Sequence, residues 1–398
     1  MHKDRTAILF IITAFISGLC GAFFYPLSSL FIVEALGASP MMLSAYMVTA
    51  VVSSVIVSQV IARYSDQGWQ RKRILIVSLS CYLVTVVSFI FIREFWLAIV
   101  VVTLFGSVSG ASFGQLFALG REYGDSRFED STSFLSIMRA GIAIAWVFGP
   151  PVAFILKAQF GFNASFAASA FIVCTAIVVI ACYLPDSVVK PDVEEKDKVT
   201  APSSINFLIV LYAFVVVFAF AANNLYIVSM PLYLSQELKV EANWLGVLFG
   251  VAALCEIPVM FYAGKLAARF GTVRVMSVGL VSGCLFFVTM LIATDKAMLI
   301  AAQIFNGIFI GSCATLGMVA LQDMMRDRLG TASTLFSNLL NVSMLAASLA
   351  VGVVGELFSY YSAFYVCLFA IVLAYLLLSL FAYKLNKKQR QVPCPATA

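Results

Sequence analysis

The sequence holds a single histidine, His2, and no pair of cysteines with the spacing of a metal or redox motif. Its nine cysteines are scattered along the chain, so neither a metal site nor a redox pair is expected. It also lacks the G-x-x-x-x-G-K-S/T loop that binds nucleotide phosphates, which argues against transport driven by ATP. We therefore predict no cofactor and no metal.

Charge is scarce as well: 11% of the residues are charged and 62% are hydrophobic. A soluble domain is about 25% charged and about 45–50% apolar. Apolar stretches recur along the whole chain, and each is long enough to cross a hydrocarbon core about 30 Å thick. The sequence thus predicts an all-α membrane protein with twelve spans, at 6–33, 41–62, 74–92, 95–119, 131–157, 161–184, 206–234, 242–264, 275–293, 297–322, 330–355 and 361–383.

The basic residues predict the orientation of these spans. The two termini and the loops after each even-numbered span hold 20 of the 25 lysines and arginines. The opposite side holds Arg93, Lys157, Lys239 and Lys296. Because basic loops stay in the cytoplasm, both termini are predicted to be cytoplasmic, with an uncleaved first helix. This bias accounts for the net charge of +5, which therefore gives no sign of nucleic-acid binding.

The spans divide into two halves of six. The polar stretch 185–205 predicts a cytoplasmic linker between an N-terminal half, 1–184, and a C-terminal half, 206–384, followed by a cytoplasmic tail, 385–398. Three short stretches repeat weakly at an offset of about 200 residues, as duplication predicts. Paired halves of this kind are typical of secondary transporters that work by alternating access. A single chain suffices for that function. A membrane enzyme would need a cluster of histidine, cysteine or aspartate at one depth, and a sensor would need a soluble output domain; neither is visible.

Amide side chains predict which helices line a cavity. Amides are costly to bury in lipid, so they should face protein or a water-filled cavity. Apart from Asn163 at the start of span 6, none occurs in spans 3, 6, 9 or 12, which we therefore expect to face lipid. We predict that the amides contact the substrate as a set, although each alone could be an interhelical hydrogen bond: Gln115, Asn223, Asn224, Gln303, Asn306, Asn338 and Asn341.

An arginine and a tryptophan share one face of the fifth span. Arg139 lies about 12 Å into the span, where an unpaired charge is destabilising by at least about 2.5–3.5 kcal/mol. Trp146 follows seven residues later on the same helical face. One interpretation is a substrate site, in which the guanidinium donates to hydroxyl groups and the indole stacks on an apolar face of the bound molecule. The alternative is structural: an ion pair that braces helices, and a tryptophan that fills space.

Two carboxylates are candidates for proton coupling. Glu256 is the only carboxylate deep in a span, and small residues on its helical face direct it toward another helix. Glu122, at the cytoplasmic end of span 4, lies seven residues after Gln115. Glu256 could instead pair with Arg139, and Glu122 could simply be solvated.

Three stretches, "QLFALGREYGDS", "SFLSIMRAG" and "AWVFGPPVAFIL", resemble the bacterial sugar efflux transporter family of the major facilitator superfamily. The resemblance implies the major facilitator fold, a sugar substrate (a mono- or disaccharide or a glucoside), export across the bacterial inner membrane, and antiport with protons. The alternative is a proton-coupled exporter of drugs or small metabolites. The arginine common in span 4 of drug antiporters is missing from "TLFGSVSGASFGQ", which weakens that alternative.

The loop after span 2, "ARYSDQGWQRKR", resembles the acidic and basic loop motif of the superfamily through Asp66, Gly68 and Arg71. The corresponding loop after span 8, "GKLAARFGTVR", keeps Arg269 but has Ala268 at the acidic position. The resemblance implies a gating role for this motif, in which only the first copy can use an acidic residue.

Overall fold

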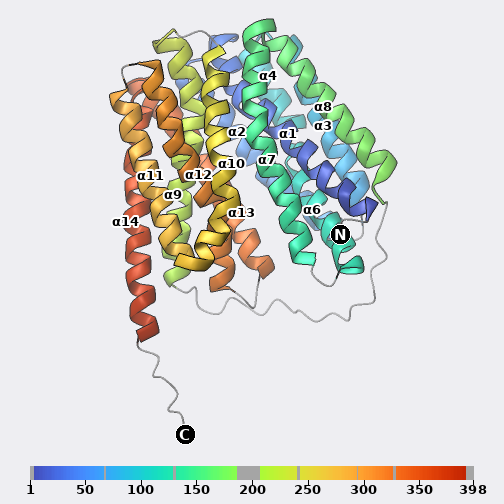
Figure 1. Ribbon diagram of the computed structural model, residues 1–398. Coiled ribbons are helices and arrows are strands. Elements are labelled where there is room, and N and C mark those ends of the chain that lie inside the picture. The colour runs from blue at the N-terminus through green and yellow to red at the C-terminus, as the bar shows by residue number, and fades with distance from the viewer. Residues whose placement is uncertain are drawn as a thin grey trace. The chain divides into compact units, whose positions relative to one another are not determined.

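The computed structural model describes residues 4–66, 69–128, 131–185, 207–239, 243–293, 295–325 and 329–390 (Figure 1). Its helices supply twelve candidate membrane spans, which confirms the predicted fold class. The predicted linker, except Pro185, lies outside the described residues, as do Gly68 and residues 391–398. The division into halves at that linker stays a prediction.

The first six spans are built from eight helices. The fourth span is composite, because α4 passes through a π-helical segment, Val102–Gly106, into α5 and α6. The other spans are single helices. The bounds are α1 (Arg5–Glu34), α2 (Pro40–Asp66), α3 (Arg71–Phe91), α4 (Phe95–Val101), α5 (Ser107–Ser109), α6 (Ala111–Arg127), α7 (Ser131–Phe160) and α8 (Phe162–Tyr183).

The last six spans begin with α9, which continues into a second π-helical segment, Tyr233–Glu237. The bounds are α9 (Phe207–Leu232), α10 (Asn243–Phe270), α11 (Thr272–Ile292), α12 (Lys296–Met324), α13 (Leu329–Leu357) and α14 (Ala363–Arg390). Glycines with a positive φ, Gly161 at 83° and Gly271 at 91°, make the tight turns before α8 and α11. Only glycine adopts that backbone conformation without strain.

Side chains fix the start of α1. Asp4 caps the helix by accepting from the backbone N–H groups of Thr6 at 3.0 Å and Ala7 at 3.3 Å. The same carboxylate accepts from the Tyr123 hydroxyl at 2.7 Å, which ties α1 to α6. The hydrogen bond from Tyr123 is the main cause that lowers the pKa of Asp4, because it stabilises the charged form.

The chain forms two compact units, and each is described by itself. Unit 1 holds residues 1–198 together with 231–250 and 351–356. Unit 2 holds residues 199–230, 251–350 and 357–398. The helices α10 and α13 therefore contribute to both units, and the π-helical continuation of α9 belongs to unit 1.

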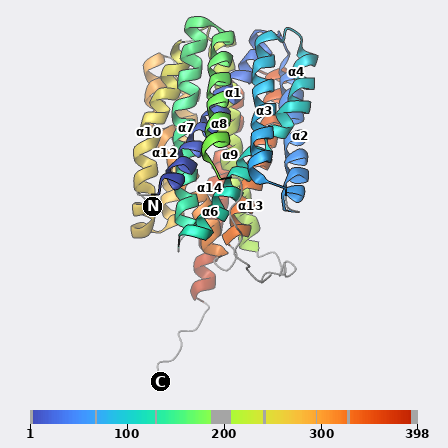
Figure 2. The same ribbon diagram turned by 90° about the vertical axis from the view of Figure 1, so that its right-hand side faces the viewer.

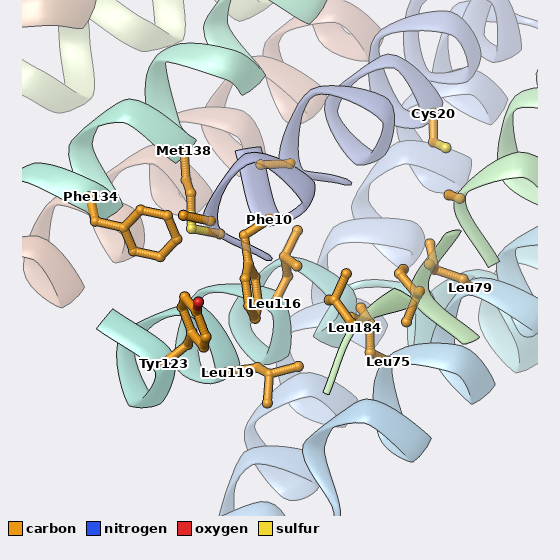
Figure 3. Packing of buried hydrophobic residues seen from close by; sticks show 14 of the residues in the cluster. Phe10, Cys20, Leu75, Leu79, Leu116, Leu119, Tyr123, Phe134, Met138 and Leu184 are labelled. Atoms are coloured by element: carbon orange, nitrogen blue, oxygen red, sulfur yellow. The ribbon is translucent and has the colours of Figure 1, made fainter. Parts of the chain in front are cut away.

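The core of unit 1 lies between α1, α3, α6, α7 and α8. Phe10 packs against both Tyr123 and Phe134, at ring-centroid distances of 5.2 and 6.0 Å (Figure 3). Leu75, Leu79, Leu116 and Leu184 extend this cluster of buried side chains toward α3 and α8. The helices α3 and α8 run side by side in both views (Figures 1 and 2).

Small residues bring α1 and α7 into close contact. A Cβ atom on Gly18 would lie 2.8 Å from the Cβ of Ala145, and one on Gly149 would lie 2.5 Å from the Cβ of Ala22. Gly149 lies just before Pro150 and Pro151, yet α7 continues through both prolines. This packing fixes which face of α7 is turned toward α1.

Unit 2 packs α11 against α12 and α14. Tyr212 of α9 donates to the Gly317 carbonyl of α12 at 3.0 Å, and Ser282 of α11 donates to the Phe305 carbonyl at 2.9 Å. The helix α14 carries a row of exposed apolar side chains that includes Phe369 and Leu376. Such a row is what a lipid-facing helix presents.

Candidate functional site

Arg139 projects from α7 toward α6. Its guanidinium carbon lies 5.4 Å from the centroid of the Phe117 ring, within the range of a cation–π interaction. The side chain is half-buried, whereas Ile137 and Phe148, on the opposite face of α7, are 43% and 48% exposed. The charge therefore lies on the face of α7 that is turned away from these exposed apolar side chains.

Trp146 lies two helical turns further along α7, about 10 Å from Arg139 at about 1.5 Å per residue. Its ring meets that of Tyr25 on α1 edge to face, with centroids 6.3 Å apart at 61°. The indole also lies over Gly21, where a Cβ atom would be 3.9 Å away. Arg139 and Trp146 thus occupy one face of α7, as their seven-residue spacing predicts.

A second group of predicted residues forms a network at the ends of α2, α3 and α6. The Gln115 amide oxygen accepts from the Ser65 hydroxyl at 2.7 Å, and the same hydroxyl accepts from Arg71 Nη1 at 2.8 Å. Arg71 Nε donates to Glu122 Oε1 at 2.8 Å. Gln115, predicted to bind substrate, and Glu122, predicted to couple protons, therefore lie in the same network as Arg71 of the loop motif.

Sequence reasoning missed Ser65, which joins Gln115 to Arg71. A signal was available, because Ser65 directly precedes Asp66 of the loop motif, and Gln115 and Glu122 share one face of their helix. Asp66 is the last residue of α2. At the end of α10, Arg269 is exposed, and its guanidinium lies 5.2 Å from the Phe270 ring. The two copies of the loop motif thus differ: Arg71 is hydrogen-bonded to Ser65 and Glu122, whereas Arg269 is exposed.

In unit 2, two amides of α12 form a buried cluster with α9. Gln303 is fully buried, and its amide oxygen accepts from the Tyr226 hydroxyl and from Asn306 Nδ2, each at 3.2 Å. Gln303 Nε2 donates to the Leu299 carbonyl at 3.1 Å. The Asn306 oxygen, by contrast, has no hydrogen-bond partner among the described residues, although Asn306 is only 6% exposed. Gln303 is bound within the protein, and Asn306 retains an acceptor for another group.

The remaining amides differ in their surroundings. Asn224 donates to the Ser343 hydroxyl at 3.2 Å, which links α9 to α13. Its neighbour Asn223 is half-buried. On α13, Asn338 and Asn341 are exposed and lie on one helical face. These two amides are the most accessible of the predicted set.

Glu256 lies where α10 packs closely against two glycines of α12. A Cβ atom on Gly307 would lie 2.8 Å from the Glu256 nitrogen, and one on Gly311 would lie 3.0 Å from its carbonyl oxygen. The residue is half-buried, and the structure describes no cation of unit 2 within ion-pair distance of its carboxylate. The two glycines therefore pack against the backbone of Glu256, and its carboxylate lies within the span.

The described residues contain no group of three histidine, cysteine or acidic side chains that could hold a metal ion. The arrangement instead consists of an arginine, a tryptophan and several amides on membrane-spanning helices. Side chains of these kinds are able to form hydrogen bonds and stacking contacts with polar molecules.

The comparisons with known proteins identify the family. A model of the Major Facilitator Superfamily matches residues 10–213 and again residues 212–396. The chain is 32% identical over 365 residues to sugar efflux transporter A of Dickeya chrysanthemi, covering 92% of this chain and 93% of the relative. It is 33% identical over 371 residues to sugar efflux transporter B of Salmonella typhimurium strain LT2, covering 93% and 94%. For sugar efflux transporter C of Escherichia coli strain K12, the identity is 32% over 372 residues, covering 92% and 93%.

Solved structures show the same fold. The nucleoside transporter NupG matches with a TM-score of 0.76 at 12% identity, over 96% of this chain and 100% of NupG. A bacterial homologue of ferroportin in an inward-facing state matches with a TM-score of 0.69 at 13% identity, over 95% and 98%. The protein is thus a multi-pass membrane transporter and not an enzyme. The chain belongs to the bacterial sugar efflux transporter family of the major facilitator superfamily.

Proposed function

We propose that this protein exports small sugars across the bacterial inner membrane by alternating access. The observation that carries the proposal is the identity of 32–33% to three proteins named sugar efflux transporters, over more than nine tenths of the chain. Uptake of radiolabelled glucose, lactose and methyl glucoside into inverted vesicles tests it. Accumulation above that of vesicles without the protein is expected, and uptake equal to theirs for all three sugars contradicts it.

The chemistry of the candidate site supports a sugar as substrate. A polyol carries both donors and acceptors, and amides such as Asn306 and Asn341 offer both as well. Arg139 supplies further donors, and Trp146 supplies an aromatic face for the apolar side of a pyranose. A site for lipophilic drugs would contain more aromatic and acidic side chains and fewer amides.

Substitutions at Arg139 and Trp146 test this assignment. Lysine keeps the charge of Arg139 but loses its planar fork of donors. We expect Arg139→Lys to fold and to bind sugar about ten- to a hundredfold more weakly, since a hydrogen bond to a charged group contributes about 1.5–3 kcal/mol. Trp146→Phe keeps part of the stacking, and Trp146→Ala keeps little. Equilibrium binding and melting in detergent are measured on each variant.

The competing role of Arg139 is a bracing ion pair with Glu256, and it predicts another pattern. If Arg139 has this bracing role, Arg139→Lys binds sugar with the affinity of the wild type. The double variant Arg139→Leu with Glu256→Leu recovers the expression that either single variant loses. Melting losses without binding losses assign Arg139 to the scaffold.

We further propose antiport with protons, with Glu256 as the proton carrier. Its support is the position of this carboxylate deep in a span. Among the described residues of unit 2, no lysine or arginine lies within ion-pair distance of it. Glu256→Gln should abolish efflux driven by a proton gradient and leave sugar counterflow, which needs no net proton movement. Gradient-driven efflux at the wild-type rate would show that Glu256 is structural. Because Glu122 is bound to Arg71, it is the weaker candidate.

The orientation with both termini in the cytoplasm rests on the 20 basic residues of one side. A reporter enzyme fused after residue 398, or inserted near 195, should be active only in the cytoplasm. Activity of either fusion on the periplasmic side contradicts this topology.

A further inference from the structure

The hydroxyl group of Tyr25 is buried and has no hydrogen-bond partner among the described residues. Tyr25 lies on α1, and its side chain as a whole is half-buried. A buried hydroxyl without a partner destabilises a fold, because it loses its hydrogen bonds to water and gains none in return. The packing of the helices therefore does not explain why a tyrosine, rather than a phenylalanine, occupies this position.

Three other buried or half-buried tyrosines of this protein have hydrogen-bond partners within the fold. Tyr82 donates to the Cys20 carbonyl at 2.7 Å, Tyr212 to the Gly317 carbonyl at 3.0 Å, and Tyr226 to the Gln303 amide at 3.2 Å. Tyr82 bonds α1 only five residues before Tyr25. The fold thus satisfies a tyrosine hydroxyl beside this same helix, and the state of Tyr25 is not a general property of the apolar interior.

Two more hydroxyls of α1, on Thr13 and Ser17, are buried without a described partner. With Gly21 and Tyr25 they are spaced four residues apart, so they lie along one stripe of the helix. Serine and threonine hydroxyls can rotate to bond a carbonyl of their own helix one turn back. The phenol of Tyr25 stands too far from its own backbone for that, so its partner must come from another molecule or another segment.

The neighbour of Tyr25 is Trp146, which belongs to the candidate sugar site. The close contacts of Gly141 with Ile11 and of Gly149 with Ala22 show how α1 and α7 are aligned, with higher numbers of one beside higher numbers of the other. The order along this pair of helices is therefore Arg139, then Trp146, then Tyr25. Tyr25 extends the polar and aromatic face of α7 at the end away from Arg139.

We propose that Tyr25 is a further substrate-contacting residue, and that its hydroxyl bonds a hydroxyl group of a bound pyranose. The tyrosine and indole rings meet edge to face at 6.3 Å and form a corner that takes the apolar C–H face of the sugar. The phenol both donates and accepts, as does a sugar hydroxyl. This inference rests on the proposed function and adds a specificity-determining residue to it.

Tyr25→Phe and Tyr82→Phe form a matched pair of variants that test the proposal. Purified full-length protein is titrated with radiolabelled glucose, lactose and methyl glucoside, and its melting is measured without sugar. Tyr25→Phe should bind the sugar that the wild type prefers about three- to tenfold more weakly, as the loss of one neutral hydrogen bond predicts. Without sugar it should melt at the wild-type temperature or higher, because the substitution removes an unpaired buried hydroxyl.

Tyr82→Phe should behave in the opposite way, with a lower melting temperature and unchanged sugar affinity, because its hydroxyl bonds a backbone carbonyl. Two results overturn the assignment of Tyr25: wild-type affinity in Tyr25→Phe, or a melting loss in Tyr25→Phe as large as that of Tyr82→Phe. If the wild type binds none of the three sugars, the proposed function itself is contradicted. That result is distinguishable from a failure of the Tyr25 assignment alone, in which the wild type binds sugar and Tyr25→Phe binds it equally well.

Discussion

Arg71 links the end of α2 to α6. Its guanidinium donates to Ser65 and to Glu122, each at 2.8 Å, and Ser65 in turn donates to Gln115. The side chains of Arg71 and Glu122 are only 17% and 26% exposed. Because the pair is partly shielded from water, its contribution to stability should exceed that of a surface ion pair.

Glu122→Ala should therefore lower the free energy of unfolding by about 1–3 kcal/mol, since it removes the carboxylate that accepts from Arg71 Nε. The control is Asp125→Ala. Asp125 lies 4.0 Å from Arg121 in a pair whose side chains are 54% and 60% exposed. Its loss should change stability by about 0.5 kcal/mol or less. Thermal melting in detergent measures both variants, and equal losses would show that the network contributes nothing beyond a surface pair.

At this scale the sequence predicted some placements and not others. Arg139 and Trp146 share a face because a helix repeats every 3.6 residues, and this needs no knowledge of other helices. The partner of Gln115 is Ser65, 50 residues earlier, and no local pattern links them. Likewise, Trp146 meets Tyr25 only because α1 and α7 pack together, and no local pattern links these two residues. Contacts within a helix were therefore predictable, and contacts between helices were not.

The close contact between α1 and α7 depends on glycine and alanine residues. A Cβ atom on Gly149 would meet both the Cβ and the backbone of Ala22, at 2.5 and 3.2 Å, so no side-chain rotation relieves the clash. Gly149→Ala should destabilise the protein by about 1–3 kcal/mol through overpacking. The control is Gly114→Ala in α6, where nothing lies within 4 Å and alanine should be neutral or stabilising by up to about 1 kcal/mol. Melting temperatures that fall equally would contradict this account.

Helix ends were harder to predict than helix interiors. The predicted spans stop where apolar residues give way to polar ones, at 62, 119, 264 and 383. The helices continue to Asp66, Arg127, Phe270 and Arg390. A backbone hydrogen-bond ladder does not need lipid, so a helix passes from the membrane into water without a break. Hydropathy marks the bilayer and not the end of the helix.

At the scale of the whole molecule, unit 1 includes segments of the C-terminal half. Gly246 of α10 approaches α7 so closely that a Cβ atom would lie 3.2 Å from the Pro151 carbonyl oxygen. Phe249 stacks on Phe154 with ring centroids 5.4 Å apart. Elsewhere in unit 1, Gly352 of α13 is in direct contact with Ser44 of α2. Under alternating access, these contacts have to separate in one state of the transport cycle.

Gly246→Leu should hold α10 away from α7 and expose the end of this contact region to water. In a background without the nine native cysteines, Ser44→Cys reports the change, because Ser44 is only 5% exposed. We expect labelling of this cysteine by a membrane-impermeant maleimide to rise when Gly246→Leu is added. The reagent acts from the side where Ser44 lies, which the predicted topology places in the periplasm. Labelling that stays at the level of Ser44→Cys alone would count against a separating contact.

The sequence predicted twelve spans, because hydropathy is a property of each segment alone. It did not predict that α10 and α13 belong to two packing units, because that depends on which neighbours their ends meet. The glycines at 246 and 352 are the only local sign of these contacts, and glycine also occurs in membrane helices that make no such contact.

The boundary between the units cuts through the chain after residues 230, 250 and 350, where α9, α10 and α13 pass from one unit to the other. Pro231, Gly250 and Gly352 lie at or beside these points. Proline removes a rung from the helical ladder, and glycine widens the torsion angles open to the backbone. Each of these helices therefore carries, at or beside the point where it changes unit, a residue that weakens its backbone. A helix that bends at such a residue changes only a few backbone torsions, and the side-chain packing on either side of the bend is preserved.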